Sequence, residues 1–292
     1  MKFLVLGCNG MAGHMISLYL KEQKHQVDGF ARRESEIVNT IVGDARDTEL
    51  IRRTLENGGY RAVINCIGLL NRFAENDHEA AVFLNSYLPQ YLSKVTKNMD
   101  TQIIHVSTDC VFSGNRGGYT EKDFPDGELF YDRSKALGEL NNEKDVTFRM
   151  SIVGPDMNKD GIGLINWFMQ QHGRVKGYKN AMWTGQTTLQ LAKTIENAAI
   201  QHVHGLYNMV PDEKISKYDM LVLFNRYLRT DEVKIEPEEN FKIDKSLKRT
   251  NFEMFSYKIP DYEQQIKELG EWMNKHKSLY PHYYGGDNSL SL

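Results

Sequence analysis

Two side chains suited to acid–base chemistry, Tyr131 and Lys135, lie four residues apart in the segment FYDRSK. On a helix this spacing places both on one face. A phenol titrates near pH ~10, and a positive charge beside it lowers that pKa. We therefore expect Lys135 to prepare Tyr131 for proton exchange near neutrality. A solvated helix face would show the same spacing, so the interpretation depends on the surrounding segments.

A glycine-rich loop near the amino terminus supplies that context. The apolar run Lys2–Leu6 predicts a buried strand, and helical spacing begins after the loop Gly7–Gly13. Glycines at such a junction let backbone N–H groups approach a pyrophosphate at the positive end of a helix. The spacing G-x-x-G-x-x-G in this position predicts a dinucleotide site, and a tight turn without a ligand is the alternative.

Charged side chains follow the next two predicted strands. Arg32 and Arg33 stand where an NAD site usually has an acidic residue for the ribose hydroxyl. Guanidinium groups bind phosphate through paired hydrogen bonds, so the two arginines favour NADP(H) over NAD(H), with a solvated surface pair as the alternative. Asp44 could accept a hydrogen bond from the adenine amino group, but a plain turn or helix cap explains it equally well.

Two further strand ends complete a predicted carbonyl-reducing site. Gly68 ends the fourth strand segment, and its small size would let a dinucleotide cross close to the backbone. The tripeptide STD ends the fifth, and a hydroxyl there can donate a hydrogen bond to a carbonyl oxygen as charge develops on it. With Tyr131 as proton donor and Lys135 as the group that tunes it, these segments predict reduction of a ketone.

Strand and helix patterns alternate through residue 153, which predicts an α/β fold with a doubly wound parallel sheet of the Rossmann type. Every motif above lies at the carboxyl end of a strand, where such sheets bind ligands. We expect an NADP(H)-binding domain over residues 1–153 and a smaller substrate lobe over 154–292, with some segments returning to the main sheet. The predicted strands of the first domain are Lys2–Leu6, Gln26–Ala31, Asn39–Val42, Ala62–Ile67, Ile103–Ser107 and Val146–Val153.

The composition excludes several classes of protein. Of the 292 residues, 40% are hydrophobic and 26% charged, and the formal net charge of −3 argues against a nucleic-acid or membrane-surface binder. Three cysteines without a Cys/His cluster indicate reduced thiols and no metal site. The opening segment does not fit a signal peptide, so a cytoplasmic location is expected. The tail from Tyr280 is expected to be poorly ordered.

The segments GCNGMAG, STDCVFSG and FYDRSKALGE resemble those of the extended short-chain dehydrogenases/reductases, and most closely the dTDP-4-dehydrorhamnose reductase family. This resemblance extends over roughly residues 1–250. It implies NADPH-dependent reduction of the C4 ketone of a nucleotide-linked 4-keto-6-deoxyhexose, for the synthesis of surface polysaccharide sugars. The implied partner is a nucleotide sugar, a homodimer is compatible with the family, and no nucleic acid or membrane partner is expected.

The resemblance also implies roles for individual residues. Thr108 would polarise the ketone, Tyr131 would protonate the forming alkoxide, and Lys135 would bind the ribose and tune Tyr131. Asp109 would neighbour the substrate. Separately from the resemblance, Trp183 is a candidate for a sugar or base pocket, with a packing role as the alternative. The implied cofactor positions are Gly7, Gly10, Met11, Ala12 and Gly13 at the pyrophosphate, and Asp44, Ala45, Cys66, Ile67 and Gly68 at the adenosine and bridging regions.

Three departures from the family pattern affect the expected substrate pocket. Cys110 replaces an aromatic residue, Ile152 replaces a tryptophan, and Ser246–Asn251 replaces an Arg-Pro-containing segment. The resemblance therefore predicts the type of reaction more firmly than the identity of the substrate. A related UDP-linked N-acetylated sugar is an alternative substrate.

Other functions on the same fold remain open to different degrees. A 4,6-dehydratase is disfavoured because Cys110 stands where its glutamate base would be. An NAD-dependent sugar-nucleotide epimerase would use the same Tyr and Lys, although Arg32 and Arg33 fit NAD poorly. A non-catalytic nucleotide-binding regulatory subunit, such as that of methionine adenosyltransferase, is the alternative outside enzymes.

Overall fold

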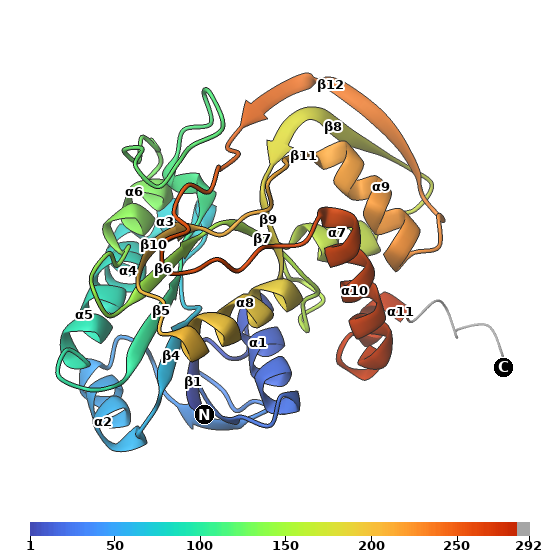
Figure 1. Ribbon diagram of the computed structural model, residues 1–292. Helices are drawn as coiled ribbons and strands as arrows, with labels where there is room; N and C mark the ends of the chain where they lie inside the picture. The colour runs from blue at the N-terminus through green and yellow to red at the C-terminus, as the bar shows by residue number, and fades with distance from the viewer. Residues whose placement is uncertain (285–292) are drawn as a thin grey trace, which may run out of the picture.

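Within residues 1–284, which a computed structural model of the protein describes, seven parallel strands form the main sheet (Figure 1). Their order is β10-β6-β5-β4-β1-β2-β3, so the chain winds outward from β1 in both directions. This is the doubly wound arrangement, and the predicted fold class is confirmed. The strands are β1 (Lys2–Leu6), β2 (Gln26–Ala31), β3 (Asn39–Val42), β4 (Ala62–Asn65), β5 (Gln102–Val106), β6 (Val146–Arg149) and β10 (Gly205–Asn208).

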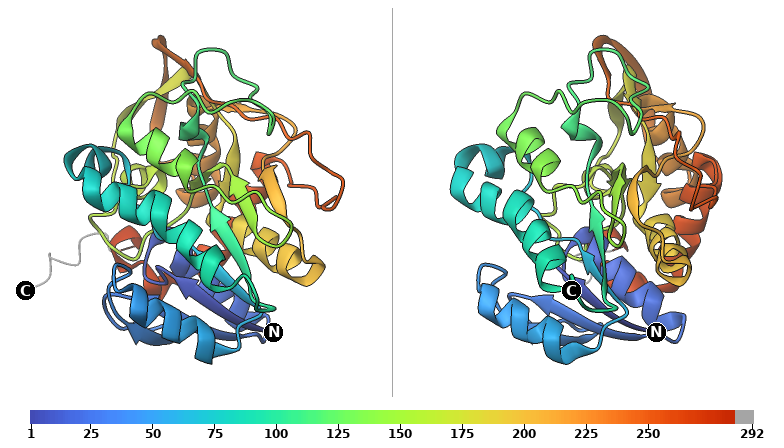
Figure 2. Two further views of the ribbon diagram at one scale, coloured as in Figure 1. Left: turned by 90° about the vertical axis from the view of Figure 1, so that its left-hand side faces the viewer. Right: turned by 60° about the vertical axis from the view of Figure 1, so that its left-hand side comes forward.

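Helices cover both faces of the sheet (Figure 2): α1 (Met11–Glu22) and α8 (Thr188–Gln201) on one, α2 (Thr48–Gly58) and α5 (Leu88–Val95) on the other. Alternate side chains of β1 join the two cores, since successive residues of a strand point to opposite faces. Phe3 and Val5 are buried in the α1 and α8 core, whereas Leu4 and Leu6 are buried in the α2 and α5 core. Burial on both faces explains the nearly continuous apolar runs of these strands.

The predicted strand Val146–Val153 is wrong in one respect, because it is interrupted at Met150. Its second part, β7 (Ser151–Val153), leaves the main sheet and pairs with β9 (Gly185–Thr187). The interruption directs Ser151 and Ile152 toward the carboxyl end of the sheet. The apolar pattern of residues 146–153 does not show whether they form one long strand or two strands that belong to different sheets.

A second sheet contains the two longest strands, which the sequence pattern did not reveal. Strands β8 (Arg174–Trp183) and β12 (Lys234–Asp244) run parallel, with the short β11 (Ile215–Ser216) on the other side of β8. Charged pairs such as Lys176 and Glu238, 2.9 Å apart, join the two long strands. In Figure 1 they arch over α9 (Lys217–Leu228), away from the main sheet.

Further helices complete the structure around these sheets. They are α3 (Asn71–Asn76), α4 (His78–Ala81), the π-helical turn η1 (Val82–Tyr87), the 3-10 turn η2 (Asp109–Val111), α6 (Phe130–Leu137), α7 (Leu164–Met169), α10 (Tyr262–Lys275), the 3-10 turn η3 (Lys277–Leu279) and α11 (Pro281–Tyr284). None of the helices in the described part of the chain is long and apolar enough to cross a membrane. Strand β10 and helix α8 come from beyond residue 153, and the division of the chain there stays a prediction.

The carboxyl-terminal segment packs against the first helix, contrary to the predicted disorder from Tyr280. The Tyr280 side chain is fully buried, and its hydroxyl lies 2.9 Å from Nε2 of His14 on α1. Nδ1 of the same imidazole lies 3.0 Å from the Gly10 carbonyl, so Nδ1 carries the proton and Nε2 accepts from Tyr280. The rest of the predicted tail, residues 285–292, lies outside the described residues.

Candidate active site

The glycine-rich loop is shaped by close backbone packing. Gly7 has a φ of +80°, and its carbonyl accepts a hydrogen bond of 2.9 Å from the Gly10 amide. A Cβ atom on Gly13 would lie 2.1 Å from that same carbonyl oxygen, so only glycine fits there. Helix α1 begins directly after Gly10, so its free N–H groups and positive end face the cavity described next. The loop therefore has the form that a pyrophosphate requires.

A cavity of about 780 Å³ lies at the carboxyl ends of β1, β4, β5 and β6, and the second sheet closes its far side. It brings together most of the residues that the sequence predicted to act on cofactor or substrate. Those that line it are Gly10, Met11, Ala12, Gly13, Cys66, Ile67, Gly68, Thr108, Asp109, Tyr131, Lys135 and Trp183. The predicted residues that do not line it are Gly7, Arg32, Arg33, Asp44 and Ala45.

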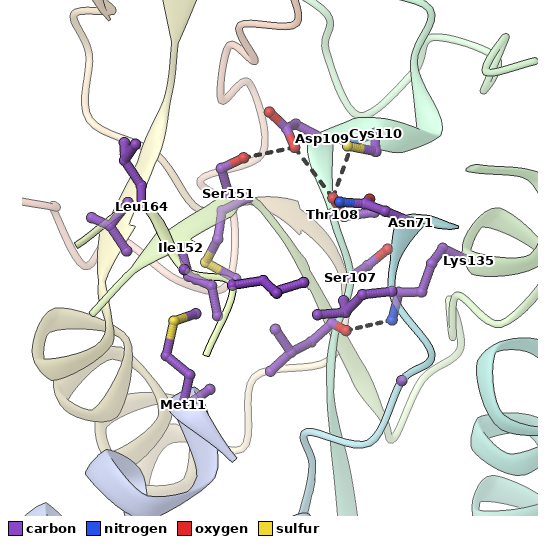
Figure 3. A pocket seen from close by; sticks show the side chains of 18 of the residues that line it. Met11, Asn71, Ser107, Thr108, Asp109, Cys110, Lys135, Ser151, Ile152 and Leu164 are labelled. Carbon is purple, nitrogen blue, oxygen red and sulfur yellow. Dashed lines mark hydrogen bonds between the residues drawn. The ribbon is translucent and has the colours of Figure 1, made fainter. Parts of the chain in front are cut away.

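Three hydroxyl and carboxyl groups point toward one another on the cavity wall (Figure 3). The hydroxyl of Ser151 donates to Oδ1 of Asp109 at 2.7 Å, and that of Thr108 lies 3.2 Å from the same oxygen. Thr108 Oγ1 also accepts from the Cys110 amide at 3.1 Å, which caps the turn η2. Burial raises the pKa of Asp109, while the hydrogen bond from Ser151 opposes this. Thr108 is thereby held in place with its hydroxyl at the cavity.

Tyr131 stands in the first turn of α6, and only 5% of it is exposed. Its ring packs against Ala74 and Ala81, and its backbone amide donates to Glu75 at 2.9 Å. Burial raises the pKa of the phenol, the nearby Cys110 raises it further, and a hydrogen bond with Thr108 lowers it. The structure therefore differs from the predicted lowering of the Tyr131 pKa, because burial outweighs any effect of the lysine.

Lys135 lies one helical turn after Tyr131, but its ammonium group reaches the end of β5. Nζ donates a hydrogen bond of 2.8 Å to the Val106 carbonyl, as Figure 3 shows. Burial lowers the pKa of this lysine to about 8, while Glu139 acts to raise it, as Cys66 would only when ionised. A Cβ on Gly68 would lie 3.9 Å from Nζ, so the lysine faces the path where a dinucleotide was predicted to cross.

The predicted adenosine side lies next to the glycine loop, outside the cavity. Arg32 and Arg33 are exposed directly after β2, and the Arg33 carbonyl accepts from Nδ2 of Asn9 at 3.0 Å. Asp44 accepts from Nε of Arg46 at 3.2 Å and from the Arg46 amide at 2.9 Å, the geometry of a turn. Those bonds with Arg46 lower the pKa of Asp44. The turn that was an alternative for Asp44 is therefore present.

Several cavity residues were not predicted from the sequence. Ser151 and Asn71 line it near Thr108, and Lys217 and Lys245 bring positive charge from the second sheet region. Lys217 begins α9 and Lys245 follows β12, so their positions depend on the strands that the sequence pattern missed. Ser151 could have been predicted from its position just after a strand end, two residues beyond Arg149.

A family model, that of the RmlD substrate binding domain, matches residues 1–283. The chain belongs to this family. The match extends over both the glycine loop and the second sheet, and it confirms the resemblance to extended short-chain dehydrogenases/reductases of the dTDP-4-dehydrorhamnose reductase type.

The curated relatives of this chain carry names of different functions. A probable low-salt glycan biosynthesis reductase of Haloferax volcanii is 34% identical over 46% of this chain and 46% of that protein. A dTDP-4-dehydrorhamnose reductase of Burkholderia thailandensis is 32% identical over 48% of this chain and 45% of that protein. The methionine adenosyltransferase 2 subunit beta of Xenopus tropicalis is 22% identical over 74% and 69%. The chain thus spans about half the length of the two reductases.

Solved structures share the whole fold. A dTDP-4-dehydrorhamnose reductase of Bacillus anthracis in complex with NADP has a TM-score of 0.77 at 18% identity, with 92% of this chain and 98% of that chain covered. One of Clostridium acetobutylicum has a TM-score of 0.76 at 22% identity, with 94% and 100% covered. At such identities the likeness establishes a common architecture.

Proposed function

We propose that the protein uses NADPH to reduce the C4 ketone of a nucleotide-linked 4-keto-6-deoxyhexose. The observation that carries this proposal is that Thr108, Tyr131 and Lys135 line one cavity together with the glycine-rich loop. Membership of the RmlD substrate binding domain family and the reductases among its relatives support the same reaction class. Reductive synthesis of a surface sugar is the pathway role that fits.

Each of the lining residues has a defined task in this proposal. The loop Gly10–Gly13 and the amino end of α1 would hold the pyrophosphate of NADPH, which supplies the hydride when bound. Thr108 donates a hydrogen bond to the ketone oxygen, and Tyr131 gives it a proton. A phenol with a raised pKa suits reduction, because Tyr131 still carries its proton when the ketone oxygen becomes a basic alkoxide. Lys135 contributes a positive charge at neutral pH.

A screen of cofactor oxidation tests the reaction. Purified protein and NADPH are incubated with dTDP-, UDP- and GDP-linked 4-ketohexoses, and products are identified by NMR. We expect turnover with at least one of these sugars and a product reduced at C4. Stable NADPH in the presence of all of them would contradict the proposal.

Cofactor preference is expected to depend on Arg32 and Arg33. Replacing both with Ser should weaken NADPH binding by ~10-fold or more, because a hydrogen bond to a charged group contributes about 1.5–3 kcal/mol. NADH binding should change little, since NADH has no 2′-phosphate. Fluorescence titration with both cofactors measures this, and Arg53→Ser on α2 is a control for loss of an exposed arginine. Equal losses for the two cofactors would reject the 2′-phosphate interpretation.

Lys217 and Lys245 are the proposed partners of the substrate diphosphate, because both bring positive charge to the cavity. Replacing both with Met should raise the KM for the sugar nucleotide ~10-fold or more and leave NADPH affinity unchanged. Lys214→Met is the control, since Lys214 pairs with Asp244 and does not line the cavity. An unchanged KM in the double variant would remove these lysines from substrate binding.

A regulatory nucleotide-binding subunit is the second candidate. The relative that aligns with 74% of the chain, methionine adenosyltransferase 2 subunit beta, is named as a subunit and not as a reductase. In that case NADPH would raise the Tm of the protein without being oxidised by any of the sugars. The intact Thr108, Tyr131 and Lys135 favour the reductase.

A further inference from the structure

A buried ion pair lies beneath the cavity, beyond the residues that would touch the cofactor. Glu139 follows α6, and one of its carboxylate oxygens accepts from Nε of Arg149 on β6 at 2.7 Å. A second contact between the two groups makes the pair bidentate. The side chains are only 6% and 4% exposed, and the guanidinium also lies over the ring of Phe112. The pair therefore joins the end of α6 to the end of β6.

The same carboxylate contacts the cavity wall. The hydroxyl of Ser107, a lining residue, donates to Oε1 of Glu139 at 2.7 Å. Glu139 also lies four residues after Lys135, and its charge acts on that ammonium. One buried carboxylate thus binds both Ser107 and Arg149, and its charge acts on Lys135.

Three other titratable groups near Lys135 are neutral at pH 7. Burial raises the pKa of Cys66 to about 12, so this thiol is neutral. His105 has its pKa lowered well below the usual range by burial and by Lys135 itself, so it is neutral too. Burial keeps Tyr131 protonated. Arg149 brings a positive charge, but Glu139 binds it directly.

We propose that Glu139 is a positioning residue of the active site: bound to Arg149, it fixes Ser107 and provides the negative charge that keeps Lys135 a cation for cofactor binding. This rests on the proposed nicotinamide cofactor. Lys135 is so deeply buried that, without a nearby carboxylate, it would lose its proton closer to neutrality. The ion pair with Arg149 keeps the carboxylate in place.

The test follows NADPH binding by fluorescence from pH 6 to pH 9.5. In the wild type, affinity should fall as pH rises through about 8, where Lys135 loses its proton. In Glu139→Gln this fall should move to lower pH. If only the protonated lysine binds NADPH, a shift of one pH unit makes binding about fivefold weaker at pH 8, with little change at pH 6. Glu139→Asp retains the charge and should restore the wild-type profile.

A control separates this effect from loss of stability, since breaking a buried ion pair also destabilises a protein. Leu55→Ala on α2 removes buried apolar volume away from the cavity and should lower the Tm without moving the pH profile. A profile of Glu139→Gln that coincides with the wild type, while NADPH still binds, would overturn the inference alone. Failure of the wild type to bind NADPH at any pH would overturn the proposed cofactor and this inference together.

Discussion

Replacing Tyr131 with Phe is expected to lower turnover of the ketosugar by ~10²-fold or more, the usual contribution of a general acid. The change removes one oxygen from a ring that packs against Ala74 and Ala81, so the fold should persist. NADPH affinity should stay nearly unchanged, because the ring remains and Lys135 keeps its contact with Val106. Steady-state kinetics and fluorescence titration on the same preparation measure both quantities.

A matched control is Tyr60→Phe, which removes another buried hydroxyl, one bonded to Asp28 at 3.1 Å outside the cavity. Its turnover should equal that of the wild type. If Tyr131→Phe also keeps full turnover, Tyr131 does not donate the proton. In that case the hydroxyl of Thr108, which lines the same cavity, becomes the next group to examine.

Gly13→Ala is expected to disrupt the glycine loop and to reduce NADPH affinity ~10-fold or more. The added Cβ would lie 2.1 Å from the Gly7 carbonyl oxygen and 2.7 Å from its carbon, so the loop and the start of α1 must move apart. Overpacking of this kind costs roughly 1–3 kcal/mol, and here it acts on backbone that cannot rotate away. Thermal unfolding and cofactor titration measure the two losses.

Gly10→Ala in the same loop is the comparison for stability. Its Cβ would meet only the Gly7 carbonyl oxygen, at 3.4 Å, and its φ of −80° is available to any residue. We therefore expect a Tm close to that of the wild type for Gly10→Ala and a lower one for Gly13→Ala. Equal Tm values would show that the loop relaxes freely and that its close packing is unimportant.

The sequence was most informative where burial is complete on both sides of a strand. In β1 and β4 every internal position is apolar and buried, so a continuous apolar run that ends shortly before a glycine was enough to place them. The pattern failed for β12, where most side chains are exposed and Pro237 interrupts the run. Pairing with β8 stabilises that strand, and pairing is not visible in a local pattern of hydrophobicity.

The candidate site shows the same limit. Thr108, Tyr131 and Lys135 could be selected because short motifs at strand ends carry a chemical meaning of their own. The raised pKa of Tyr131 could not be predicted from a motif, because it depends on how deeply residues from other segments bury the ring. Lys217 and Lys245 were missed for a related reason, since the second sheet brings them to the cavity from distant parts of the chain.

The contact between His14 and Tyr280 has a consequence for how the protein matures during synthesis. The imidazole that accepts from the Tyr280 hydroxyl also donates to the Gly10 carbonyl, so a residue far along the chain supports the glycine-rich loop. A nascent polypeptide translated only as far as residue 279 would lack this support for α1, even though all seven strands of the main sheet precede that residue. We therefore expect the glycine-rich loop to reach its final form only after Tyr280 has been synthesised and has packed against His14.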